Sequence, residues 1–144
     1  MNYRSYNTKI FSVFTIFLLM IFSSSCAKKI IFQPSVAVPA ATGKVKIKKD
    51  DNNNYSIILN VQNLADAKRL SPPQNTYVVW IMTKERGVQN IGQIKSSTGF
   101  LSGKIKASLN ALSPFKPTRV FITAEKNSDV LYPGSQEILT TRNF

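Results

Sequence analysis

The chain of 144 residues contains no histidine, one cysteine and only seven acidic residues. Without histidine it lacks the side chain that most often performs acid–base catalysis near neutral pH and binds transition metals. A single cysteine excludes an intramolecular disulfide and a cysteine-based zinc site. There is also no Gly-x-Ser-x-Gly motif and no phosphate-binding glycine loop. The sequence therefore predicts no catalytic residue, no metal ligand and no cofactor.

Positive charge, by contrast, is abundant. Lysine and arginine number 19, which gives a formal net charge of +12. Such an excess favours a nucleic acid, an anionic membrane or an acidic polymer as partner, or serves solubility alone.

The first 26 residues have the order of an export signal. Arg4 and Lys9 precede an apolar run at residues 10–22, and three serines separate that run from Cys26. The run is of secretory length and is shorter than the roughly 20 apolar residues that a membrane-spanning helix needs.

The only cysteine directly after such a run resembles a bacterial lipobox. The resemblance implies cleavage after residue 25, acylation of Cys26 with palmitate-type chains, and a periplasm-facing lipoprotein of the cell envelope. Lys28 and Lys29 would then lie near anionic head groups. Two alternatives stay open: a plain signal peptide in which Cys26 is incidental, and an uncleaved N-terminal anchor. The predicted parts are a signal peptide at 1–25, a lipidated cysteine and tether at 26–42, and a folded domain at 43–144. Within the tether, the proline-containing segment 30–42 could contribute one edge strand.

The domain has the pattern of short strands separated by turns, without sustained helical periodicity. Residues 50–54 predict a hairpin turn, 97–99 a further turn, and the prolines near 63–76 and 114–117 predict crossings between two sheets. The expected fold is an all-β, antiparallel, immunoglobulin-like β-sandwich of about seven strands. The expected strands are residues 44–48, 55–61, 77–82, 90–95, 100–109, 120–125 and 136–141.

Several short motifs resemble the extracytoplasmic domain of anti-sigma-K factors. They are Gly43-Lys-Val, Asn63-Leu64, Thr76-Tyr-Val-Val-Trp80, Gly92, Ile122-Thr-Ala-Glu125 and Tyr132-Pro-Gly134. The resemblance covers residues 43–141 and implies an immunoglobulin-like sandwich outside the membrane. Only nine residues precede the apolar run, so sigma-factor sequestration is not expected, and the family assigns no catalytic residues.

Alternating lysines mark the candidate binding face. They are Lys44, Lys46, Lys48, Lys104 and Lys106. In each of the two strands the lysines are expected to face outward while apolar residues face the core. They form either a surface for an anionic lipid, glycan or polymer, or a device for solubility and sheet-edge protection.

Other candidate sites have simpler interpretations beside the functional one. Trp80 with Tyr77 forms either an aromatic binding platform or part of the core. Asp50 and Asp51 attract calcium or simply shape a turn, and they lack EF-hand spacing. Glu85, Glu125 and Glu137 show no spacing typical of a glycosidase pair. Nucleic acid is not an expected partner, because an exported domain would not meet it.

These observations lead to one expected function and two alternative hypotheses. We expect a non-enzymatic binding module, held on a membrane by its lipid anchor, with an envelope protein or an anionic glycan or lipid as partner. The second hypothesis is an accessory or sensory component of envelope signalling, and the third is an enzyme with a Ser–Lys or carboxylate site. The sequence leaves the oligomeric state open.

Overall fold

The computed structural model describes residues 27–98 and 105–144. Cys26, Lys104 and the expected signal segment lie outside these ranges. The described part contains nine strands and one short 3-10 helix, η1 (Ala67–Arg69). The strands are β1 (Lys28–Ile31), β2 (Thr42–Lys49), β3 (Tyr55–Gln62), β4 (Thr76–Thr83), β5 (Gly87–Gln93), β6 (Lys95–Thr98), β7 (Ile105–Ser113), β8 (Pro117–Glu125) and β9 (Glu137–Thr140).

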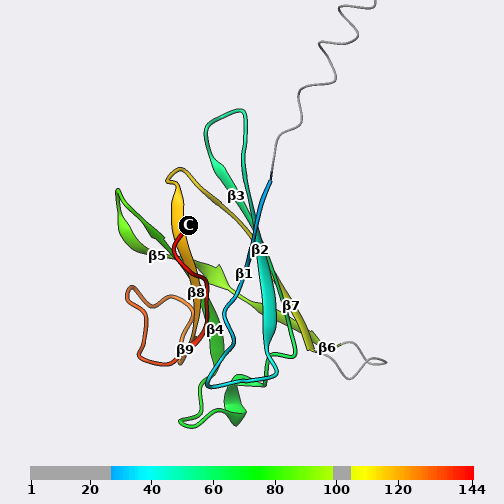
Figure 1. The fold of residues 1–144 in the computed structure, drawn as a ribbon. Coiled ribbons are helices and arrows are strands. Elements are labelled where there is room, and N and C mark those ends of the chain that lie inside the picture. The colour runs from blue at the N-terminus through cyan, green and yellow to red at the C-terminus, as the bar shows by residue number, and fades with distance from the viewer. Residues whose placement is uncertain (1–26, 99–104) are drawn as a thin grey trace, which may run out of the picture.

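The strands form two antiparallel sheets that face each other (Figure 1). One has the order β1-β2-β3-β7-β6 and the other β5-β4-β8-β9. The chain changes sheet between β3 and β4, between β5 and β6, and between β7 and β8. The predicted all-β antiparallel sandwich is confirmed, and so are the crossings at 63–76 and 114–117. The immunoglobulin-like variety of sandwich stays a prediction.

The main core lies between the sheets because alternate residues of the facing strands are apolar. Val45, Ile57 and Leu59 from the five-stranded sheet are fully buried, and they belong to the same core as Val79 and Ile122 from the four-stranded sheet. Each side chain of this size contributes roughly 1.5–3 kcal/mol when it leaves water. The period of two therefore places the core residues as predicted.

Two short strands raise the count above the predicted seven. β1 pairs with β2, and β6 continues almost directly from β5 but belongs to the other sheet. The turn expected at 97–99 is wrong for Ser97 and Thr98, which pair with β7. A Ser-Ser-Thr run suits a strand as well as a turn, since threonine is β-branched. Gly99 lies outside the described residues.

The segment expected to be a tether belongs largely to the sandwich. Its backbone bridges both sheets, since the Phe32 amide donates to the Gly43 carbonyl (3.1 Å) and the Gln33 amide to the Thr140 carbonyl (2.8 Å). Phe32, Val38 and Ala41 are buried in the core. Prolines in this segment prevent a long strand but do not prevent burial of its apolar side chains. Residues 28–41 therefore pack against the sandwich, and β1 is an edge strand of its five-stranded sheet.

No helix in residues 27–98 and 105–144 is long and apolar enough to cross a membrane.

A buried phenol gives the fold a pH-dependent contribution. The Tyr77 hydroxyl donates to the Ala65 carbonyl (2.9 Å). Burial, together with the nearby Asp66 carboxylate, raises the pKa of Tyr77 to about 12. The folded state thus holds the phenol proton more tightly than the unfolded chain, whose pKa is near 10.

We expect the protonated Tyr77 phenol to make its full contribution to the free energy of unfolding below pH 10. That contribution should be lost as the pH rises from 10 to 12. Urea unfolding of the native chain and of Tyr77→Phe at several pH values measures it. The difference in free energy of unfolding between the two proteins should fall across this window by at most about 3 kcal/mol. A difference that stays constant from pH 9 to 12 would contradict the burial of an ionisable phenol.

Candidate functional site

The exposed lysines of the five-stranded sheet gather on its outer surface. β2 and β3 pair in register, so Lys44, Lys46 and Lys48 lie opposite Asn60, Ile58 and Ser56. All three lysines are exposed, while Val45 and Ile47 between them face the core. This group, with two further lysines from neighbouring strands, is called the basic face below. Its members are Lys29, Lys44, Lys46, Lys48 and Lys106.

Four of the five lysines predicted from the sequence belong to this face. Lys106 reaches it from β7, where it pairs with Gln62 of β3. Lys104 lies outside the described residues. Lys29 was not predicted for the face: it sits on β1, directly opposite Lys46. The run Lys28-Lys29-Ile30-Ile31 does not alternate, so it gives no local signal, and the register that joins β1 to β2 cannot be read from the sequence.

Negative charge is absent from the basic face. All seven acidic residues of the chain lie in the described part, and all lie in turns, in the crossing loop, or on and after β8 and β9. Residues two apart on a strand are neighbours on one face, roughly 6.7 Å apart along the backbone, and two unit charges at that separation in water repel by about 0.6 kcal/mol before screening. Like charges directly opposite each other, such as Lys29 and Lys46, are also unfavourable. Solubility alone is better served by interspersed charges of both signs.

Edge protection does not account for all of these lysines either. β2 and β7 each have a neighbour on both sides, so neither is an edge strand. Lysine guards a sheet against unwanted pairing only where a strand edge is open. That explanation applies to Lys29 on β1 and to Lys48, which lies beyond the part of β2 that pairs with β1. It does not apply to Lys44, Lys46 and Lys106.

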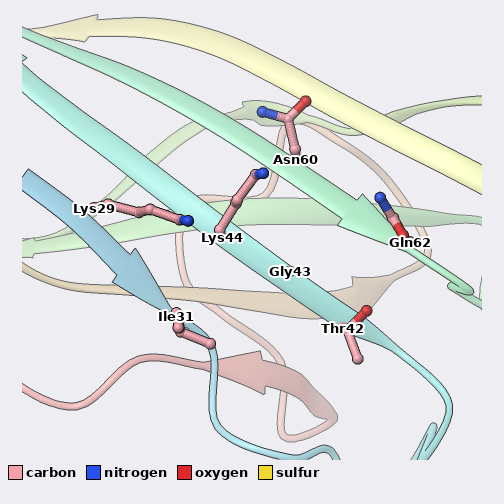
Figure 2. Close-up of a pocket in the computed structure, with 7 residues that line it drawn as sticks. All are labelled: Lys29, Ile31, Thr42, Gly43, Lys44, Asn60 and Gln62. Carbon is pink, nitrogen blue, oxygen red and sulfur yellow. The ribbon is translucent and has the colours of Figure 1, made fainter.

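A shallow groove crosses one part of the basic face (Figure 2). Its volume is about 240 Å³. The backbone of β2 around Gly43 forms the floor, with β1 on one side and β3 on the other. The lining residues are Lys29, Ile31, Thr42, Gly43, Lys44, Asn60 and Gln62.

The groove offers a specific set of interactions. Lys29 and Lys44 supply cationic donors, and the amides of Asn60 and Gln62 both donate and accept hydrogen bonds. Ile31, which is 72% exposed, adds a small apolar contact. No aromatic side chain lines it. The combination suits a ligand that carries negative charge and hydroxyl groups.

The aromatic platform considered for Trp80 does not exist, because Trp80 is 0% exposed. It lies in a second, smaller core with Val78 and Phe121, and its ring stacks on that of Phe121 with centroids 6.3 Å apart. Val130, from the loop between β8 and β9, packs against this cluster. The alternative interpretation, a core tryptophan on a central strand, is confirmed.

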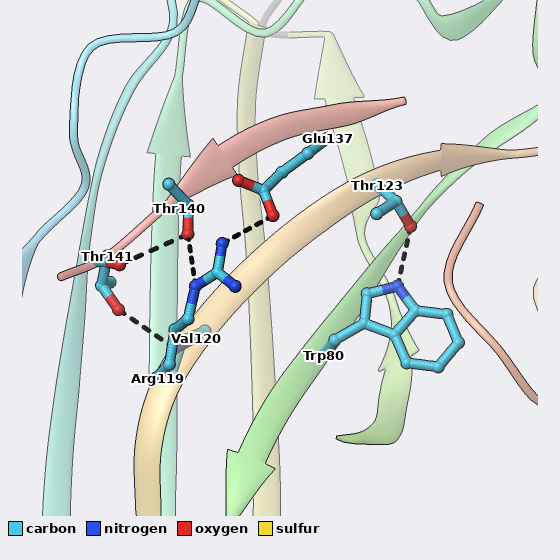
Figure 3. Close-up of polar contacts among 7 residues, drawn as sticks. All are labelled: Trp80, Arg119, Val120, Thr123, Glu137, Thr140 and Thr141. Atoms are coloured by element: carbon cyan, nitrogen blue, oxygen red, sulfur yellow. Dashed lines mark hydrogen bonds and ion pairs between the residues drawn. The ribbon is translucent and has the colours of Figure 1, made fainter. Parts of the chain in front are cut away.

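A chain of buried hydrogen bonds fixes this second core. The Trp80 Nε1–H donates to Thr123 Oγ1 (2.7 Å; Figure 3), and that hydroxyl donates to Glu125 Oε1 (2.5 Å). The same carboxylate oxygen accepts the Gly134 amide (2.7 Å). A Cβ at Gly134 would stand 2.8 Å from the other oxygen of Glu125. A larger residue at this position would therefore require the Glu125 carboxylate to shift.

The remaining carboxylates are used in local structure. Asp50 Oδ1 accepts the amides of Asn52 (2.9 Å) and Asn54 (2.8 Å), so it shapes the predicted hairpin turn. Glu137 pairs with Arg119 at 2.7 Å (Figure 3). In the part of the chain that the structure describes, no three histidine, cysteine or acidic residues are grouped so that they could hold a metal ion.

Comparison of the chain with protein-family models, with curated proteins and with solved structures gives no match.

Truncation of the buried tryptophan tests this assignment of core and surface. We expect Trp80→Ala to lower the free energy of unfolding by roughly 3–5 kcal/mol, because it leaves a cavity in the second core and removes the donor to Thr123. Tyr132→Ala is the control, because Tyr132 lies in the loop between β8 and β9, which packs against the Trp80 cluster through Val130, but is itself 81% exposed. Its effect should stay within about 0.5 kcal/mol. Urea denaturation measures both, and equal losses would contradict the assignment.

Proposed function

We propose that this chain is a non-enzymatic lipoprotein of the cell envelope whose basic face binds an acidic glycan chain. One observation carries the binding proposal: five lysines share a sheet face without any acidic residue, mainly on interior strands, and two of them, Lys29 and Lys44, line a groove with amide side chains. The mutual repulsion of these lysines is relieved when an anionic ligand lies across them.

The membrane anchor in this proposal rests on Cys26. It is the only cysteine of the chain, and it follows an apolar run and three small residues, an order that resembles a lipobox although Ser23 stands where leucine is commonest. A diacylglyceryl group with a further acyl chain would hold the protein firmly, whereas one acyl chain holds only marginally. The domain would thereby be kept where envelope glycans are concentrated.

An extended glycan fits the basic face better than the other anionic partners considered. The face is the outer surface of a sheet, so it can follow a linear chain over several strands. Asn60 and Gln62 provide the amide groups that bind sugar hydroxyls, next to the charge of Lys44 (Figure 2). Single-stranded nucleic acid is normally bound on exposed aromatic platforms, and the groove has none.

The test compares an acidic oligosaccharide with its neutral form. Oligogalacturonate and its methyl ester have the same sugar backbone, but the ester lacks the charge. We expect the native protein to bind the acid and not the ester, with affinity that falls steeply as salt is raised. Isothermal titration calorimetry at low and high ionic strength measures this difference.

Charge reversal then locates the site. The triple variant Lys29→Glu, Lys44→Glu and Lys46→Glu should weaken binding on the order of 10- to 100-fold, since each exposed charge contact contributes up to about 1 kcal/mol. Its matched control is Lys68→Glu, Arg69→Glu and Lys126→Glu, which changes the net charge equally but lies away from the face. Equal weakening by both variants, or equal binding of acid and ester, would contradict the proposal.

A further inference from the structure

One end of the sandwich, called the proximal end below, collects the turns near the start of β1. Lys28 pairs with Ile47, close to the hairpin turn that joins β2 and β3. The turns between β4 and β5 and between β7 and β8 lie at the same end, as their strand registers require. The Phe144 amide donates to the Thr118 carbonyl (2.9 Å), so the last described residues return to this end as well (Figure 1).

The proximal end is strongly and asymmetrically basic. Its exposed cations are Lys28, Lys48, Lys49, Lys84, Arg86, Lys116 and Arg142. Its acidic residues are Asp50, Asp51 and Glu85, and the Asp50 carboxylate already accepts two amides of its own turn. Among the described residues of the opposite end, the excess of positive charge is smaller. Its exposed charged residues are Lys68, Arg69, Lys106 and Lys126 against Asp66 and Asp129, and the buried Glu125 adds one more acidic residue.

Two cations of the proximal end lie over aromatic rings. The Arg86 guanidinium is 5.4 Å from the ring centroid of Phe115, and the Lys28 ammonium is 5.0 Å from that of Phe144. Both phenylalanines are only partly buried. Partly buried rings beside cations suit the boundary between lipid head groups and acyl chains, where one part of a side chain stays in water.

The length of chain before β1 decides how close this end would come to a membrane. Only Ala27 separates Cys26 from Lys28, so the Cα atoms of Cys26 and Lys28 can be at most about 7 Å apart. The head-group region on each side of a bilayer is itself about 5–8 Å thick. If Cys26 is acylated, the proximal end cannot avoid the lipid surface.

We propose that the proximal end is a membrane-docking surface that binds anionic phospholipid head groups and holds the strands upright on the bilayer. This inference rests on the lipid anchor of the proposed function and adds a second membrane contact, made by the folded domain itself. Each cation near the surface of an anionic bilayer strengthens the binding of the protein to that bilayer by roughly fivefold. The domain would therefore keep one orientation relative to the membrane instead of rotating freely about its lipid anchor.

Hydrogen–deuterium exchange on the native protein tests this orientation. The protein is purified from membranes and placed in nanodiscs of phosphatidylcholine, with or without phosphatidylglycerol. We expect amides in the turns 50–54, 84–87 and 115–116 to exchange more slowly with the anionic lipid. Amides in the loops 66–75 and 126–135 at the opposite end should be unaffected.

Two charge-reversal variants make the test specific. Lys49→Glu, Lys84→Glu and Lys116→Glu should abolish the lipid-dependent protection, while Lys68→Glu, Arg69→Glu and Lys126→Glu should keep it. Absence of protection in the three turns, or equal protection at both ends, would overturn the inference.

Intact mass measured on the same samples separates the two proposals. A protein without lipid on Cys26 overturns the anchor, whereas the exchange pattern, measured then on vesicles of the same lipids, still decides whether the proximal end docks.

Discussion

The two-residue period of a β-strand is the constraint on which the rest of this structure depends. In β2, Val45 and Ile47 are buried. The lysines that alternate with them, Lys44, Lys46 and Lys48, therefore lie on the outer surface of the sheet. A slip of one residue against β3 would carry three ammonium groups into the core, at a cost that no apolar gain could offset. The register that stabilises the sandwich is therefore the same register that assembles the basic face. Core and candidate site cannot be changed independently along this strand.

Patterns within one strand were readable from the sequence, whereas contacts between distant segments were not. The alternation of Tyr55–Gln62 and the apolar run around Trp80 predicted their strands correctly. The place of Lys29 opposite Lys46 depends on how β1 pairs, and no local pattern encodes that register. The hydrogen-bond chain from Trp80 to Gly134 was likewise hidden, because it joins β4, β8 and a loop through their tertiary packing.

Three of the six motifs that led to the expectation of an anti-sigma-K-like domain meet around this second core, at residues 76–80, 122–125 and 132–134. Trp80, Thr123, Glu125 and Gly134 belong to them, and together they hold the loop between β8 and β9 on the sheet. Their role in this chain is thus accounted for by packing and hydrogen bonding. A part in envelope signalling stays a hypothesis, and the charged surfaces lie elsewhere on the molecule. If the proximal end contacts a bilayer, the strands would run roughly perpendicular to the membrane plane. The basic face would then be directed along the membrane surface, where a glycan could bind it.

The proposed roles of the basic face and of the proximal end both depend on a lipid attached to Cys26. Lipidation of Cys26 is therefore the most direct test. The measurement is the intact mass of the protein isolated from the membranes of bacteria that express the full chain. We predict a mature chain that begins at Cys26 and is heavier than residues 26–144 by one diacylglyceryl group and one further acyl chain, and that Cys26→Ser removes this increment. An unmodified Cys26, or a chain that keeps its first 25 residues, would contradict a lipid-anchored envelope protein.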